Sequence, residues 1–328
     1  MAAWDRPLEQ VADLLRRMST AGRLPIPALV VASALFGGAV TGTKYALGGF
    51  DPFTLLLVEL FAATVALWAC LLARGYRRPQ SWKLAVVLGL LEPGSAYLGQ
   101  TFGLAHTSAA HGAVICGLES AFVVLLAAAV LRERITRSTA LAVLLAFIGL
   151  IVLQGGNPFG GAGFGDLFVA LGVLSASAYT VVLKRSRDAS DSLALTACQF
   201  TAATTLAFAV VSGRWAAGAS TVPSAVPAKF WVAAALVGIG GFGLSFILFN
   251  ASISRITAGA ASVVLNLIPI FGLLSATLVL GETLGLAAGV GALLIGSSVL
   301  SFVVVEVRAV RSALRPRSVP QLPVPQLR

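Results

Sequence analysis

The sequence predicts an all-α integral membrane protein of ten transmembrane helices, arranged as two inverted five-helix repeats with N and C termini cytoplasmic. Three observations lead to this fold class: long apolar stretches, a one-sided distribution of basic residues and an internal repeat. Of the 328 residues, 58% are hydrophobic and only 11% are charged. A soluble fold of this size needs more polar residues to cover its surface. Function is therefore expected inside a helix bundle.

The apolar stretches are each about 20 residues long, enough for a helix to cross a hydrocarbon core about 30 Å thick. Glycine, proline and charged residues separate them. The expected spans are 25–47, 52–73, 82–105, 109–131, 137–154, 164–184, 192–212, 229–251, 257–280 and 285–305. We expect residues 1–24 to form a cytoplasmic segment with no cleavable signal peptide, and residues 306–328 to form a basic, proline-rich cytoplasmic tail.

The basic residues place both termini in the cytoplasm. On this ten-span map, all but three of the 23 Lys and Arg residues fall on one side of the membrane. The exceptions are Lys44, Arg214 and Lys229. This asymmetry follows the positive-inside rule. The net charge of +10 is thus a sign of topology, with cations facing anionic lipid headgroups, and no nucleic acid is expected as a partner.

The sequence carries no motif for a cofactor. Cys70, Cys116 and Cys198 all lie inside expected spans and lack metal or redox spacing, so neither a disulfide framework nor a metal site is expected. A nucleotide-binding loop of the form G-x-x-x-x-G-K-[ST] does not occur, so ATP is not the expected energy source.

The chain also aligns with itself. Polar and aromatic residues coincide at offsets of 140 and then 149 residues: Lys44 with Lys184, Asp51 with Asp191, Trp82 with Trp231, and Glu133 with Glu282. The two repeats are expected to be 25–154 and 164–305. Because each contains an odd number of spans, the second enters the membrane from the opposite face. Inverted repeats are a common construction of secondary transporters.

Two runs of sequence resemble the paired EamA domains of the drug/metabolite transporter superfamily. They are GSAYLGQTFGLAHTSAAHGAVICGLESAFVVLLAAAVLRERIT and its counterpart GFGLSFILFNASISRITAGAASVVLNLIPIFGLLSATLVLGETLG. The resemblance covers about residues 25–305. It implies a central cavity lined mainly by spans 1, 3, 4, 6, 8 and 9, and export of amino acids, metabolites or drugs. Two positions differ from the family pattern: Glu59 stands where arginine is common, and Ser120 where proline is common.

Glu92 and Glu119 are the leading candidates for a functional site. Each lies ten residues into its span, about 15 Å deep and near the bilayer midplane. Charged side chains at that depth are costly, and two carboxylates on neighbouring helices favour a shared or exchangeable proton. The pair would couple transport to protons or anchor the amino group of a substrate. The alternative is a pair of neutral acids that hydrogen-bond to helix carbonyls for packing.

Residues that interrupt helices are expected to act as hinges beside this site. Pro93 and Gly94 directly follow Glu92, and the equivalent stretch of span 8 is rich in glycine. Interrupted helices at matching places in two halves indicate a midplane binding site. The alternative is close helix packing through small residues. The predicted hinge residues are Pro93, Gly94, Gly240, Gly241, Gly243 and Pro269.

Other polar and aromatic residues are candidates for the walls of the cavity. They are Tyr97, Gln100, Tyr179, Phe242, Phe246, Asn250 and Asn266. Hydrogen bonding or packing between helices is an equally open role for each. For Glu59, whose repeat partner is Gln199, a structural hydrogen bond is favoured over ligand contact.

The charged residues at span ends have simpler expected roles. Lys44 and Lys184 are expected to extend to the headgroups. Glu133 and Glu282 are expected to cap or pair at loop ends. His111 is either a polar boundary residue or a proton relay toward the outside.

These observations predict a secondary active transporter in the bacterial cytoplasmic membrane, exporting small organic metabolites such as amino acids or drug-like amines by alternating access, with proton coupling as an option. Its partners would be the small-molecule substrate and membrane lipid, and a homodimer is left open. One alternative is a membrane-embedded enzyme, although the H-E-x-x-H and G-x-S-x-G motifs do not occur. The other is a non-transporting scaffold.

Overall fold

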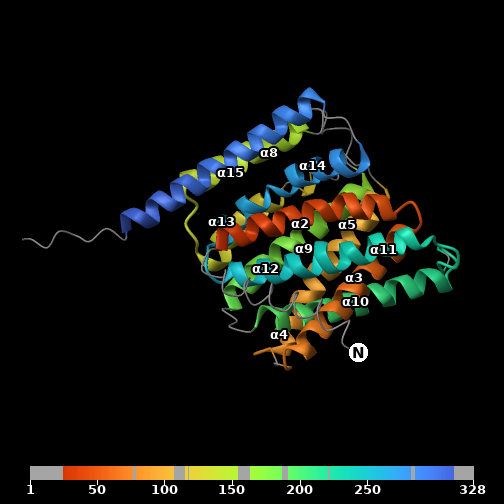
Figure 1. Ribbon diagram of the computed structural model, residues 1–328. Coiled ribbons are helices and arrows are strands. Elements are labelled where there is room, and N and C mark those ends of the chain that lie inside the picture. The colour runs from red at the N-terminus through yellow and green to blue at the C-terminus, as the bar shows by residue number, and fades with distance from the viewer. Residues whose placement is uncertain are drawn as a thin grey trace, which may run out of the picture.

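The protein is a bundle of helices, shown in Figure 1 as a computed structural model that describes residues 25–76, 79–106, 115–116, 118–153, 163–186, 191–220, 222–281 and 285–313. The first half contains α2 (Pro25–Ala46), α3 (Pro52–Ala73), α4 (Trp82–Gly89), η2 (Leu90–Ser95), α5 (Ala96–Leu104), α7 (Glu119–Leu126), η3 (Ala127–Leu131) and α8 (Arg137–Leu153). The second half contains α9 (Phe164–Ser186), α10 (Ser192–Ala216), α11 (Ala228–Leu236), η4 (Val237–Leu244), α12 (Ser245–Ile253), α13 (Ala258–Leu265), α14 (Ile268–Leu280) and α15 (Leu286–Ala313).

Within the described ranges, seven helical segments are long and apolar enough to cross a membrane. They are Pro25–Ala46, Pro52–Ala73, Phe164–Ser186, Ser192–Ala216, Ala228–Ile253, Ala258–Leu280 and Leu286–Val305. The expected span 82–105 is covered by α4, η2 and α5 in direct succession. Two further apolar helices, Glu119–Leu131 and Arg137–Leu153, are shorter. The chain is therefore an all-α membrane protein of about ten helices.

Matching residues begin matching helices in the two halves. Asp51 caps α3 by accepting hydrogen bonds from the backbone N–H and hydroxyl of Thr54, and Pro52 supplies the favoured first residue. Asp191 caps α10 by accepting from the Leu193 N–H. Each cap satisfies an N–H group that has no partner inside its own helix.

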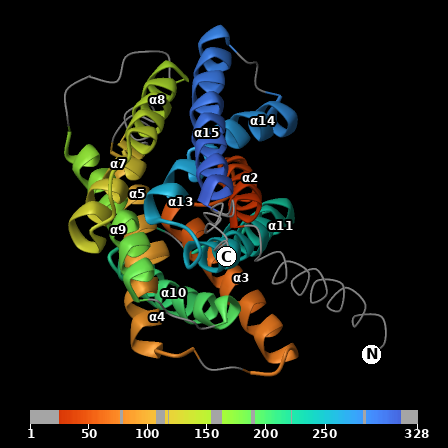
Figure 2. The same ribbon diagram turned by 90° about the vertical axis from the view of Figure 1, so that its left-hand side faces the viewer.

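The helices are arranged in a layered bundle with a packed centre. In both views, α8 and α15 run side by side along one edge and α3, α4 and α10 lie at the opposite edge (Figures 1 and 2). Between them lie α2, α9, α12 and α13. The main core is built around fully buried side chains such as Leu60, Phe200, Tyr179 and Phe246.

The two halves touch through equivalent positions. A Cβ at Gly89 would clash with the carbonyl oxygen of Gln199, and a Cβ at Gly238 would clash with that of Glu59. Only glycine allows backbones to approach this closely. The hydroxyls of Thr64 and Thr204, which are 140 residues apart, lie 2.8 Å from each other. The contacts between the two halves therefore recur at the same offsets, 140 and 149 residues, at which the sequence aligns with itself.

Helix interruptions also recur. Glu92 has extended backbone angles (φ −149°, ψ 129°) inside the wide turns of η2, and η4 has similarly wide turns in the second half. A break at Leu118 precedes α7, and a break at Leu267 precedes α14. These two breaks lie in the expected spans 4 and 9, which the family resemblance places around a central cavity.

The bundle has two ends, one marked by Lys184 and the other by Lys44. The Lys184 end is the one at which α9 and α12 end and α13 begins. At the Lys44 end, α2 ends and α11 begins, with Gly49 against Phe230. Because α11, η4 and α12 form one continuous span, these two ends are opposite.

Candidate functional site

Glu92 of η2 and Glu119 of α7 lie on two segments that both contact α9. The two carboxyl groups lie within electrostatic range of each other, and both residues are half-buried. Neither side chain has a hydrogen-bond partner within the part of the chain that the structure describes. A buried polar group is normally paired. Two half-buried carboxyl groups without such a partner are available to a cation or a proton.

Helix α9 holds the backbone beside both acids. The Ser175 hydroxyl donates to the carbonyl oxygen of Leu91 at 2.9 Å, directly before Glu92. The Ser177 hydroxyl lies 3.4 Å from the carbonyl oxygen of Glu119 itself. These serines, two residues apart on one helix of the second half, position the two acidic segments of the first half.

An aromatic wall lies beside the acids. Tyr97 is within electrostatic range of both Glu92 and Glu119 and is half-buried, as is Phe242. The centroids of the Tyr97 and Phe242 rings are 5.1 Å apart, and those of Tyr97 and Phe246 are 6.4 Å apart. Phe246 is buried and also contacts Phe36 and Tyr179. An aromatic face next to carboxylates suits an organic cation.

Tyr179 and Asn250 lie in a different environment. The Tyr179 hydroxyl donates to Asn250 Oδ1 at 2.6 Å, and Asn250 Nδ2 donates to Thr196 Oγ1 and Gln199 Oε1, both at 2.9 Å. All four residues are buried. Their polar groups thus bond α9, α10 and α12 to one another. A role of Tyr179 and Asn250 in binding substrate stays a prediction, and this geometry favours a structural role.

Gln100 and Asn266 are half-buried residues of the first and second halves. Gly172 of α9 packs against the Gln100 side chain and backbone. Asn266 lies at the break between α13 and α14. Its Nδ2 is buried and has no hydrogen-bond partner among the described residues. A contact of Asn266 with a ligand stays a prediction.

The predicted hinge residues lie in or beside the interruptions. Pro93 and Gly94 are buried within η2, and Gly240, Gly241 and Gly243 lie within η4. Pro269 is the second residue of α14. A Cβ at Gly241 would clash with Ala39, whereas one at Gly240 would meet open space. Close packing therefore explains Gly241, and movement at the other positions stays a prediction.

Three charged residues have clear structural partners. Buried Glu59 accepts a hydrogen bond from Thr43 at 2.7 Å, as the sequence analysis favours. The predicted capping role of Glu133 is confirmed, because its Oε1 accepts from the Ala258 N–H at 3.2 Å. Lys184 has a protein partner that hydropathy does not predict, because its Nζ donates to the Ile253 carbonyl oxygen at 3.0 Å. Its contact with headgroups stays a prediction. Hydropathy does not reveal that α12 ends beside α9. His111 and Glu282 lie outside the described residues.

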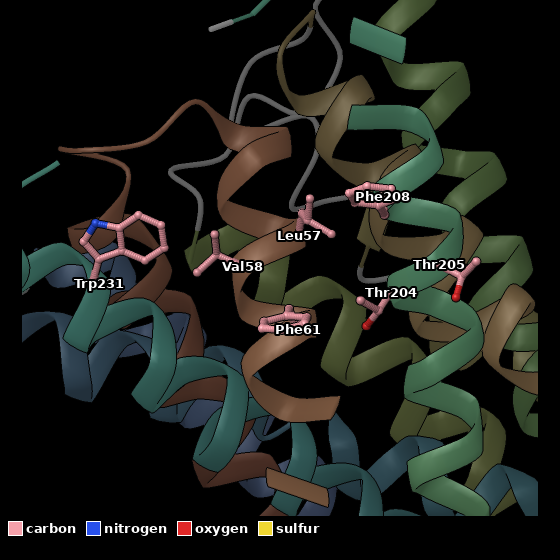
Figure 3. Close-up of a pocket in the computed structure, with 7 residues that line it drawn as sticks. All are labelled: Leu57, Val58, Phe61, Thr204, Thr205, Phe208 and Trp231. Carbon is pink, nitrogen blue, oxygen red and sulfur yellow. The ribbon is translucent and has the colours of Figure 1, made fainter. Parts of the chain in front are cut away.

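A separate groove of about 440 Å³ lies between α3, α10 and α11 (Figure 3). It is lined by Leu57, Val58, Phe61, Thr204, Thr205, Phe208 and Trp231. Phe61, Phe208 and Trp231 are exposed. None of the predicted site residues lines this groove, and it has no charged group. Its walls suit an acyl chain rather than a polar metabolite.

Comparison with protein families gives a match over most of the chain. The profile described as "EamA-like transporter family" matches residues 23–154 and 163–304, one copy in each half. Among the described residues, no group of three or more His, Cys, Asp or Glu is placed to hold a metal ion.

Individual proteins are similar at lower identity. The chain is 27% identical over 260 residues to "Uncharacterized transporter YyaM" of Bacillus subtilis (strain 168), covering 75% of this chain and 83% of that protein. It is 26% identical over 275 residues to an "Uncharacterized transporter" of Archaeoglobus fulgidus, covering 82% and 95%. A solved structure described as "Crystal structure of protein" superposes with a TM-score of 0.72 at 20% identity, covering 88% and 99%, and supports the fold alone.

Proposed function

Because the chain belongs to the EamA-like transporter family and is a multi-pass membrane transporter rather than an enzyme, we propose that it exports small organic metabolites that carry an amino group. Amino acids and drug-like amines are the proposed substrates, exchanged for protons by alternating access across the bacterial cytoplasmic membrane. The observation that carries this proposal is the unpaired carboxylate pair, Glu92 and Glu119, beside the ring of Tyr97.

The proposed mechanism needs two inverted repeats, 25–154 and 164–305. Their equivalence is supported by the paired glycine contacts of Gly89 and Gly238 and by the Thr64–Thr204 hydrogen bond. The excess of Lys and Arg on one side of the ten-span map supports a cytoplasmic Lys184 end. In such a fold, exchanging the conformations of the two halves moves a central site from one face to the other.

The substrate class follows from the chemistry of the site. Two negative charges in a bundle interior are costly unless a cation or a proton neutralises them. An ammonium group would be held by Glu92 and Glu119, with Tyr97 and Phe242 against the apolar part. The half-buried amides Gln100 and Asn266 would hydrogen-bond to its polar groups.

Proton exchange follows from competition at the same pair. A substrate ammonium and a proton each neutralise the carboxylates, so binding of one disfavours the other. Release of the amine on the outside would let the pair take up a proton and return with it. The interruptions at Pro93, Gly94, Gly240, Gly243 and Pro269 would let the helix halves move during this step. Membrane lipid would fill the groove of Figure 3.

Counterflow in proteoliposomes tests the proposal. Purified protein is loaded with an unlabelled amino acid or amine, and entry of its labelled form is measured for a panel that includes neutral and anionic metabolites. Amine-bearing compounds should exchange, and their counterparts without the amino group should not. Equal exchange of anionic metabolites would contradict the proposed substrate class.

A further inference from the structure

The two halves of one span differ in how they are enclosed. Helix α13, at the Lys184 end, has seven consecutive buried residues, Ala258–Val264. Helix α14 continues the same span toward the Lys44 end and has no buried residue. Most residues of α14 are half-buried, because it packs closely against α2, where a Cβ at Gly37 would clash with Gly272. Along the described part of this span, the Lys184 end is therefore the more tightly enclosed of the two.

Side chains from both halves close the Lys184 end. Val123, Ala127, Val181 and Ala258 form one buried cluster, contributed by α7, η3, α9 and α13. Gly259 of α13 packs against Val124 and Thr139 of the first half. These contacts must separate before this end can open.

Two charged residues hold the turn between α12 and α13. Lys184 of α9 donates to the carbonyl oxygens of Ile253 and Ser254, where α12 ends. Glu133, which follows η3, accepts from the N–H of Ala258, where α13 begins. A cation at a helix C-terminus and a carboxylate at an N-terminus are the favourable arrangement for the two helix dipoles. The start of this turn is thus held by Lys184, from the second half of the chain, and its end is held by Glu133, from the first half.

We propose that Glu133 and Lys184 form a latch that holds the cytoplasmic gate closed, and that the latch releases when the transporter turns inward. This inference rests on the topology and transport cycle proposed above. The repeat alignment pairs Lys184 with Lys44 and Glu133 with Glu282.

Cysteine labelling measures the gate without any substrate. Cys70, Cys116 and Cys198 are first replaced by serine, and Ser262→Cys is introduced on α13, where Ser262 is buried. A membrane-impermeant maleimide is then added to the cytoplasmic face of inside-out vesicles. With the latch intact, labelling of this position should be slow.

The latch variants are Glu133→Ala and Lys184→Met, each with a matched neighbour as control. Arg134 and Arg185 are exposed, so Arg134→Ala and Arg185→Met remove a charge beside the latch without removing a cap. Loss of a helix cap should raise the labelling rate about fivefold, and the controls should not change it. Glu133→Gln keeps an acceptor oxygen without the charge and should give an intermediate rate.

Labelling rates that stay at the wild-type value in Lys184→Met and in a folded Glu133 variant would overturn the latch. If Glu133→Ala does not fold, Glu133→Gln and Lys184→Met decide the question. Failure of the proposed function looks different: counterflow of amines would be absent while labelling still responds to the latch variants. Normal counterflow with unresponsive labelling would overturn the latch alone.

Discussion

Two polar clusters in the centre of the bundle differ in how their groups are used. Tyr179, Asn250, Thr196 and Gln199 are buried and bond to one another. Glu92 and Glu119 are half-buried, and their carboxylates have no hydrogen-bond partner within the described part of the chain. Polar groups that bond to one another hold helices together, even though Gln199 Nε2 has no partner among the described residues. Half-buried carboxyl groups without a hydrogen-bond partner are instead available to a ligand. The comparison predicts that one cluster serves stability and the other serves transport.

The largest expected effect is loss of transport in Glu92→Gln and Glu119→Gln. A hydrogen bond to a charged group contributes about 1.5–3 kcal/mol, so amine exchange should fall about tenfold to a hundredfold in each variant. Initial rates of counterflow measure this effect, with melting temperature as the check on folding. Asp166→Asn, at an exposed helix start, is the control. Wild-type rates in both glutamate variants would assign the pair to packing.

Asn250→Ala should instead lower stability. It leaves the Tyr179 hydroxyl and the polar groups of Thr196 and Gln199 without this partner, at a cost of about 2–3 kcal/mol. Thermal unfolding of the purified protein measures the loss. Asn266→Ala is the matched control because Asn266 Nδ2 has no partner among the described residues. An equal loss of stability in both variants would remove the distinction between the clusters.

A smaller effect is expected where the two halves meet. Gly238→Ala forces a Cβ into the carbonyl of Glu59, and overpacking of this kind costs about 1–3 kcal/mol. Gly240→Ala places the same methyl group in open space and should leave the melting temperature unchanged. If the melting temperature of Gly238→Ala equals that of the wild type, the close contact between the halves is not required for stability.

The aromatic wall should contribute less than the acids. Tyr97→Leu removes the ring that lies within electrostatic range of both acids. Loss of a cation–π contact of about 1 kcal/mol should weaken amine binding about fivefold. Tyr97→Phe keeps the ring and should bind nearly as the wild type does. Concentration dependence of counterflow separates the two variants. Equal loss in both would assign the role to the hydroxyl instead.

The smallest effect is expected for Glu59→Gln. Thr43 donates its hydroxyl proton to Glu59, and a glutamine oxygen accepts the same bond. The repeat partner of Glu59 is already glutamine, at Gln199. Transport and stability should stay within about 0.5 kcal/mol of the wild type. A strong loss of pH-dependent transport would instead add Glu59 to the carboxylate pair.

Much of this arrangement could be predicted from the sequence. The apolar runs give the spans, and the charge of Glu92 beside Pro93 indicates where a span is interrupted. The network around Asn250 could not be predicted, because hydropathy does not fix how a helix is rotated toward its neighbours. For the same reason the sequence does not predict the hydrogen bond from the Lys184 ammonium group to the end of α12. Side-chain partners across helices depend on packing that only the fold provides.

One measurement tests the central claim most directly: accumulation of a labelled amine in proteoliposomes driven by an imposed pH gradient alone. The wild-type protein should concentrate the amine on the acidic side, and a folded Glu92→Gln/Glu119→Gln variant should not. Accumulation by the double variant at the wild-type level would contradict exchange of amines for protons at this pair.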